Sequence, residues 1–157
     1  MVIVRIPLPG VSSYALSRFA TRVRRALKLP GVVGILVTSS REMQRLNKRF
    51  RQKDKPTDVL SFPSISGFAG ETAGDLAISA QIAAANARRL GHATSDEIKI
   101  LILHGMLHLA GYDHERDQGE MARKEKRLRR ALGLPGGLIE RTAQSRRHST
   151  RRLGAKA

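Results

Sequence analysis

The stretch TSDEIKILILHGMLHLA, residues 94–110, decides how this chain must fold. From Ile98 to Ala110 apolar residues occupy all sides of a helix, so the helix has no side suited to water and must lie at the centre of the domain. Thr94 and Glu97 have the spacing of a capping box and predict where the helix begins. A buried helix needs other elements around it, and the flanking sequence supplies them.

Alternating or β-branched apolar runs predict short strands, and apolar residues at helical spacing predict further helices. Ser39 and Glu42 form a second capping box, which predicts the start of one of these helices. We expect strands over residues 2–6, 32–38, 58–64 and 75–79, and further helices over 13–28, 39–50, 79–90 and 115–132. Because strands and helices interleave without strict alternation, an α+β fold is predicted.

The chain has 157 residues, which predicts one domain with a substantial core. We place this domain at residues 1–140. Residues 141–157 contain six basic residues, no acidic residue and one leucine, so they predict a basic, disordered C-terminal tail. No signal peptide is visible and no segment reaches the ~20 apolar residues of a membrane span, so a soluble cytoplasmic protein with no membrane partner is expected.

The formal net charge is +16, from 29 Lys and Arg against 13 Asp and Glu. An excess of this size favours binding to polyanions, of which nucleic acid is the commonest, although it is also compatible with a merely basic, solvated surface. Without the tail's six charges the net charge is still +10, so the basic character belongs to the predicted domain as well. Aromatic residues number only six, which favours phosphate contacts over base stacking.

The segment HGMLHLAGYDH, residues 104–114, holds three of the five histidines. His104 and His108 are one helical turn apart, which places both imidazoles on one face. Gly111 can adopt the left-handed conformation that ends a helix and turns the chain back, which brings His114 to the same point. Because the chain has no cysteine, a metal here must use nitrogen and oxygen ligands. Three imidazoles with a fourth position left open are typical of a catalytic zinc site, so one Zn²⁺ per chain is predicted.

The spacing of this motif is that of the metzincin zinc proteases, with one difference. Those enzymes carry a general-base glutamate beside the first histidine, where this chain has Gly105. Glycine can neither accept a proton from water nor orient it. The sequence therefore predicts a metal site without peptidase machinery.

Three segments together resemble the YbeY family of bacterial ribosomal RNA maturation endoribonucleases: LNKRFRQKDKPTDVLSFP (46–63), GDLAIS (74–79) and HGMLHLAGYDH. The likeness extends over about residues 2–134. It implies a mixed sheet of about four strands with helices around a central helix that carries the histidines. It also implies one zinc held by His104, His108 and His114, with functional roles for Arg51 and His114.

By the same resemblance, we expect a single-strand-specific zinc-dependent endoribonuclease. It would act in maturation of the 3′ end of small-subunit ribosomal RNA and in ribosome quality control. Its expected partners are ribosomal RNA, the small ribosomal subunit and the assembly proteins of that subunit. A non-catalytic, metal-binding ribosome assembly factor is the alternative, and a metal hydrolase with another substrate is a third reading, disfavoured by the charge. Three histidines without a fourth protein ligand argue against a purely structural zinc site.

Residues 41–55 hold seven basic residues against two acidic ones. On a helix that leads into a loop, such residues spread around the surface, so some are only solvated. From this segment we expect RNA to be bound by Arg45, Lys48, Arg49 and Arg51. The planar guanidinium of Arg51 suits a phosphate, or the charge that develops on one during cleavage.

Two carboxylates near the motifs have competing interpretations. Asp58 and Asp113 could each accept the second N–H of a metal-binding imidazole, an arrangement common around zinc. Asp58 could equally cap a turn, and Asp113 could face solvent. No residue of the motif is an obvious general base, so a metal-bound hydroxide or the 2′-hydroxyl of the RNA is left for that role.

Overall fold

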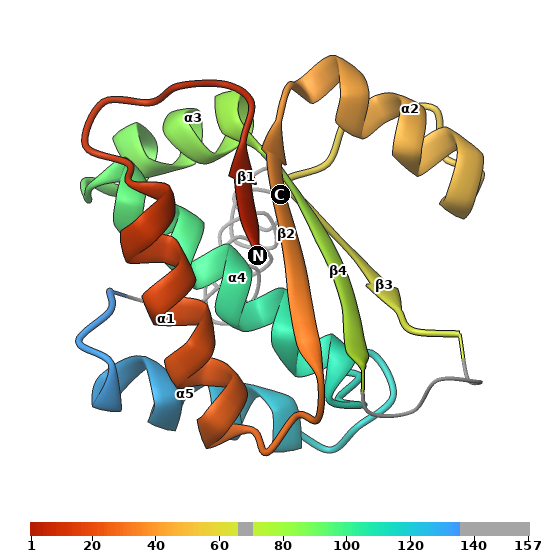
Figure 1. Cartoon of the computed structure of the whole chain (residues 1–157), viewed down its shortest axis with the longest axis vertical. Helices are drawn as coiled ribbons and strands as arrows, with labels where there is room; N and C mark the ends of the chain where they lie inside the picture. The colour runs from red at the N-terminus through yellow and green to blue at the C-terminus, as the bar shows by residue number, and fades with distance from the viewer. Residues whose placement is uncertain (66–70, 136–157) are drawn as a thin grey trace, which may run out of the picture.

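The computed structural model describes residues 1–65 and 71–135. The predicted tail at 141–157 lies outside this part of the chain. Strands and helices alternate irregularly, as expected for an α+β fold: β1 (Val2–Val4), α1 (Ser13–Ala26), β2 (Val32–Thr38), α2 (Ser40–Arg51), β3 (Val59–Pro63), β4 (Thr72–Ser79), α3 (Ala80–Leu90), α4 (Thr94–Leu109) and α5 (Glu120–Ala131) (Figure 1).

The four strands form one mixed sheet in the order β1-β2-β4-β3. β1 and β4 both run parallel to β2, and β3 is antiparallel to β4 at the other edge. The sheet therefore agrees with the expectation of a mixed sheet of about four strands. None of the helices in the described ranges is long and apolar enough to cross a membrane.

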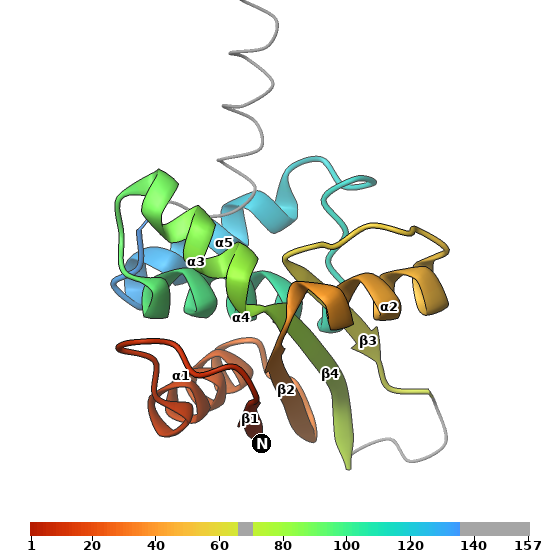
Figure 2. The same ribbon diagram turned by 90° about the horizontal axis from the view of Figure 1, so that it is seen from above.

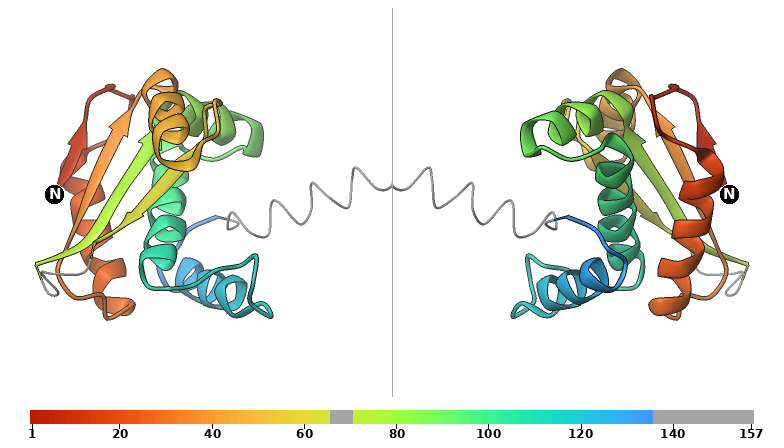
Figure 3. Two further views of the ribbon diagram at one scale, coloured as in Figure 1. Left: turned by 90° about the vertical axis from the view of Figure 1, so that its right-hand side faces the viewer. Right: turned by 90° about the vertical axis from the view of Figure 1, so that its left-hand side faces the viewer.

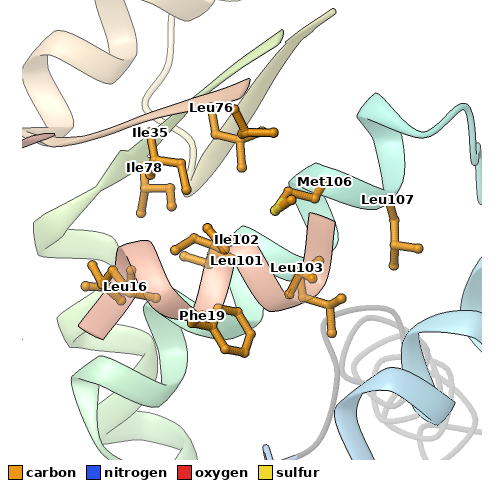
Figure 4. Packing of buried hydrophobic residues seen from close by; sticks show 14 of the residues in the cluster. Leu16, Phe19, Ile35, Leu76, Ile78, Leu101, Ile102, Leu103, Met106 and Leu107 are labelled. Carbon is orange, nitrogen blue, oxygen red and sulfur yellow. The ribbon is translucent and has the colours of Figure 1, made fainter. Parts of the chain in front are cut away.

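The predicted central helix is α4, and it is the most deeply buried helix. Ten of its 16 residues are buried, and side chains of the sheet and of α1 surround Leu101 and Ile102 (Figure 4). α4 runs alongside the sheet, with α3 and α5 on the side of α4 away from it (Figure 3). This arrangement explains why the apolar residues of α4 point in all directions: each side of the helix faces another element.

The opposite face of the sheet is covered in part by α2, whose first turn is hydrogen-bonded to α3 through the Ser40 N–H and the Gln81 side chain (Figure 2). Along β4, Leu76 and Ile78 join the main core on the side of α4, whereas Ala77 between them packs with Met43 of α2 and Leu60 of β3. The alternation follows from the two-residue period of a strand. As a result of this packing, the end of α2, the strand β3 and the helix α4 lie around one end of the molecule.

Two predictions about helix ends are wrong. Thr94 is the first residue of α4 rather than its cap: the N-cap is Ala93, with no side-chain hydrogen bond. Glu97 is fully buried and lies 2.6 Å from the His92 imidazole instead of completing a capping box. The last helix begins at Glu120 instead of residue 115, because Gly119 has φ +92° and Asp117 accepts hydrogen bonds from the backbone of the first turn.

By contrast, the cap predicted for α2 is confirmed at its serine. The hydroxyl of Ser39 accepts a hydrogen bond of 3.2 Å from the Glu42 backbone N–H. The Glu42 side chain lies 3.5 Å from Arg45. The other predicted elements are present with ends shifted by at most three residues, and β2 has the predicted bounds.

Candidate metal centre and its cleft

Three histidines meet at the C-terminal end of α4. His104 and His108 project from successive turns, and their Nε2 atoms lie 3.2 Å apart. His114 comes from the loop after the helix, with its ring centroid 5.5 Å from that of His104 and 5.4 Å from that of His108. One nitrogen from each ring lies within 4.8 Å of the other two. The convergence predicted from the spacing is thus present in the structure.

The return of the chain depends on Gly111. Its φ is +94°, a conformation that glycine adopts without a steric penalty. The turn is closed by the Gly111 N–H, which donates to His108 O at 3.0 Å, and by the Tyr112 N–H, which donates to Leu107 O at 3.1 Å. These hydrogen bonds satisfy backbone carbonyl groups at the end of α4 that would otherwise have no donor.

The same turn orients His108. Its Nδ1 lies 3.0 Å from the carbonyl oxygen of Tyr112, which can only accept, so Nδ1 carries the proton and donates it. Nε2 then keeps its lone pair toward the other two histidines. Burial, followed by the neighbouring imidazoles of His104 and His114, lowers the pKa of His108. His108 therefore stays in the neutral, metal-binding form to a lower pH than a free histidine.

A carboxylate that the sequence reading missed lies beside His104. Oε1 of Glu125, on α5, is 3.5 Å from His104 Nδ1, and the two residues are 1% and 6% exposed. Glu125 follows Met121 by four residues and precedes Leu128 by three, so it occupies the buried face of α5. The sequence signal for Glu125 is its position: a charged residue that lies on the same face of the predicted helix as Met121 and Leu128 is expected to be buried with them.

The donor set fits a borderline divalent metal. Imidazole nitrogens suit Zn²⁺ and related transition metals, and three protein ligands leave a position open for water or substrate. Nδ1 of His108 faces a carbonyl oxygen and Nδ1 of His104 has a carboxylate oxygen 3.5 Å away. An acceptor for the Nδ1 proton is the arrangement that directs Nε2 toward a metal.

The histidines lie in a cleft of about 730 Å³ between α2, β3 and the loop after α4. Arg51, the last residue of α2, lines it, and the Arg51 Nη2 donates a hydrogen bond of 2.8 Å to the carbonyl oxygen of Ser61 on β3. Lys53 and Lys55 line the cleft as well. The cleft thus combines a metal-binding cluster with three cations, a combination suited to a phosphodiester substrate.

The structure separates the four residues expected to bind RNA. Arg51 lies in the cleft, but the other three do not line it. Arg45 is 3.5 Å from Glu42, Lys48 is 3.6 Å from Asp54, and the Arg49 guanidinium lies 5.2 Å from the centroid of the Phe50 ring. They are placed on the outer surface of α2. Lys53 and Lys55, which were not among the expected RNA-binding residues, line the same cleft as the histidines.

Asp58 and Asp113 both line the cleft, and each accepts a hydrogen bond from a backbone N–H; Asp58 also accepts one of 3.5 Å from the Thr57 hydroxyl. Oδ1 of Asp58 accepts from the Val59 N–H at 2.8 Å. Oδ1 of Asp113 accepts from the Glu115 N–H at 3.1 Å, and its Oδ2 lies 3.7 Å from Arg116 Nε. This geometry favours a turn cap for Asp58 and an exposed surface position for Asp113 over orientation of an imidazole.

The position beside the first histidine is closed by packing. A Cβ atom built at Gly105 would lie 2.7 Å from Leu76 Cδ2 and 3.2 Å from Ser61 Oγ. The Ser61 hydroxyl also donates to the Gly105 carbonyl oxygen at 3.1 Å. A side chain at this position would therefore have to displace the end of Leu76, and a glutamate, as in a metzincin protease, would need still more room between α4 and the sheet.

Comparison with known proteins gives one consistent family. The family model described as "Endoribonuclease YbeY" matches residues 12–133. A protein of that name from Koribacter versatilis is 55% identical over 152 residues, which is 97% of this chain and 98% of the relative. Another from Solibacter usitatus is 53% identical over 127 residues, 81% of this chain and 84% of the relative.

A solved structure has a similar fold. The solution structure of a Thermotoga maritima protein matches with a TM-score of 0.54 and 30% identity, over 81% of this chain and 85% of that one. The motifs quoted from the sequence, the geometry of the histidine cluster and these matches agree. The chain belongs to the YbeY endoribonuclease family.

Proposed function

We propose that this protein is a zinc-dependent endoribonuclease specific for single-stranded RNA. The observation that carries the proposal is the cleft, where three convergent histidines lie beside Arg51, Lys53 and Lys55. Relatives matched over nearly the whole chain are named as endoribonucleases, which supports the reaction class. The net charge of +16 supports a polyanionic substrate.

Each part of the cleft has a distinct role in this proposal. His104, His108 and His114 would hold one zinc ion, which when bound polarises a phosphoryl oxygen and lowers the pKa of a water molecule. Arg51 stabilises the negative charge that develops on the phosphate, with its guanidinium held by the Ser61 carbonyl. Lys53 and Lys55 neutralise neighbouring phosphates. The 2′-hydroxyl of the RNA is available as the nucleophile, with its proton passing to solvent, so activation of a water molecule by a carboxylate at position 105 is not required.

The size of the cleft supports a preference for single strands. A volume of about 730 Å³ is that of a site for a small ligand. Such a space would suit a few unpaired nucleotides better than both strands of a helix. Within this proposal, the biological substrate is the 3′ end of small-subunit ribosomal RNA, and the partners are the small subunit and its assembly proteins, as the family resemblance implies. A role in ribosome quality control belongs to the same proposal.

The test compares cleavage of a labelled single-stranded RNA and its duplex by zinc-loaded protein and by two variants. His114→Ala should lose zinc and cleavage together, because a ligand is removed. His148→Ala, a matched change at a histidine of the C-terminal segment, should keep both. Elemental analysis reports the metal. A His114→Ala protein that cleaves normally, or a wild-type protein that binds RNA without cutting it, would contradict the proposal, and the second result would favour the assembly-factor alternative.

A further inference from the structure

Glu125 is a carboxylate placed where a charge is costly. It is 1% exposed and lies between Met121 and Leu128, both of which belong to the main hydrophobic core. Burying a carboxylate costs several kcal/mol unless nearby groups compensate for the lost water. An apolar side chain of similar size would fill the same space without that cost. The presence of Glu125 at this position therefore calls for a partner that needs its charge or its lone pairs.

That partner is the metal-binding imidazole of His104. Glu125 Oε1 and His104 Nδ1 lie 3.5 Å apart, and both atoms are buried and have no hydrogen-bond partner. An imidazole that binds a metal through Nε2 carries its proton on Nδ1, and that proton needs an acceptor. Asp58 and Asp113, the other carboxylates considered for this task, accept from the backbone instead.

We propose that Glu125 is a positioning residue of the metal centre, an assignment that rests on the proposed function of this site. It accepts the Nδ1–H of His104, which fixes the ring with Nε2 directed toward His108 and His114. Its negative charge also makes the imidazole a stronger ligand. The two ligands on α4 are then anchored in different ways: His108 by the Tyr112 carbonyl of the loop, and His104 by a side chain of α5.

The assignment gives α5 a task beyond packing. α5 contacts α4 directly, and the core residues on either side of Glu125 set how far its carboxylate reaches toward the histidines. A purely structural ion pair would influence the stability of the protein but not its metal affinity. A positioning residue must influence the metal affinity in a protein that remains folded.

The experiment measures the zinc dissociation constant by competition with a chromophoric chelator. Glu125→Gln keeps an acceptor but removes the charge, and we expect affinity to fall about 10-fold. Glu125→Leu removes both, and we expect a fall of about 100-fold, the upper end of the effect seen for groups that support metal ligands. Glu120→Gln, an exposed position on the same helix, serves as the matched control and should bind zinc as the wild-type protein does.

A second readout separates positioning from folding. Circular dichroism and thermal melting of the metal-free proteins report whether each variant folds, and the visible spectrum of the Co²⁺-loaded protein reports ligand geometry. We expect an altered cobalt spectrum in folded Glu125→Gln. If both variants fold and bind zinc as tightly as the wild-type protein, this assignment alone is overturned. If Glu125→Leu does not fold, unchanged zinc affinity in Glu125→Gln overturns it in the same way. Failure of the wild-type protein to bind zinc would overturn the metal centre as well.

Discussion

The guanidinium of Arg51 donates a hydrogen bond of 2.8 Å to the carbonyl oxygen of Ser61, which ties the end of α2 to β3. The hydroxyl of the same serine donates to the carbonyl oxygen of Gly105, the neighbour of His104. One residue of β3 therefore connects the arginine of the cleft with the helix that carries two of the histidines. This connection makes Arg51 part of a fixed site, although its side chain starts from the exposed end of a helix.

The first prediction concerns the role of Arg51 in cleavage. Arg51→Lys keeps one positive charge but loses the planar group with several donors, so RNA affinity should change little while the cleavage rate falls. Loss of one preorganised donor to a developing charge costs a factor of about 10²–10³ in rate. Cleavage at saturating RNA, with zinc content checked, measures this. Arg45→Lys, which lies outside the cleft, should cleave normally. A normal rate for Arg51→Lys would remove it from the catalytic residues.

The second prediction distinguishes the cations of the cleft from those of the outer surface of α2. Lys53→Ala and Lys55→Ala should each weaken binding of a short single-stranded RNA and reduce the slope of log K against log salt by about 0.7, because each removes one phosphate contact. Arg45→Ala and Arg49→Ala, which do not line the cleft, should leave the slope unchanged. Fluorescence anisotropy titrations over a series of salt concentrations measure both quantities. Equal effects at all four positions would instead indicate binding across the whole basic surface.

The third prediction concerns the close contact between α4 and the sheet. Gly105→Ala places a methyl group 2.7 Å from Leu76 Cδ2, in a core where Leu76 is 1% exposed. Overpacking costs about 1–3 kcal/mol, more than the ~1 kcal/mol that alanine gains over glycine in a helix. We expect net destabilisation of roughly 1 kcal/mol in urea unfolding.

A double-mutant cycle provides the control for that prediction. Leu76→Val removes the Cδ atoms that the new methyl group would meet. In this background Gly105→Ala should become neutral or stabilising, since only the milder contact with Ser61 Oγ at 3.2 Å still opposes the gain in helix propensity. The same cost in both backgrounds would show that Leu76 does not set the requirement for glycine.

The fourth prediction concerns the start of α5. Asp117 accepts hydrogen bonds from the Met121 N–H at 2.8 Å and the Gly119 N–H at 2.9 Å, and these bonds lower the pKa of its carboxyl group. A carboxyl group with a lowered folded-state pKa stabilises the protein above its unfolded pKa, and this stabilisation is lost as the pH falls through the folded pKa. Asp117→Asn should therefore be less stable than the wild-type protein at neutral pH. The difference should close in the acid range, below the ordinary carboxyl pKa.

Chemical denaturation of both proteins between pH 7 and pH 2 measures this difference, because the range extends below the ordinary aspartate pKa of about 4. A gap that stays constant down to the lowest pH would mean that the charge of Asp117 contributes nothing to the cap. Zinc should be removed beforehand, because His114 interacts electrostatically with Asp117.

Much of the fold and the core of the site follow from local patterns. The apolar residues around α4 require a central helix, and the four-residue spacing of His104 and His108 places their rings together whatever surrounds them. The glycine three residues later permits one sharp turn, so the approach of His114 is also a local matter. Ser39 caps α2 because its hydroxyl needs only a backbone N–H three residues away.

The remaining features depend on contacts between distant segments. Glu125 reaches His104 only because α5 packs against α4, and Arg51 meets Ser61 only because β3 lies beside the end of α2. The burial of Glu97 against His92 overrides a capping pattern that was correct in spacing. Local spacing determines which groups of one helix share a face, so the sequence by itself determined the central helix and the convergence of the three histidines. Packing determines which buried groups come together from different elements, so only the tertiary structure decided which carboxylate and which cations lie at the site.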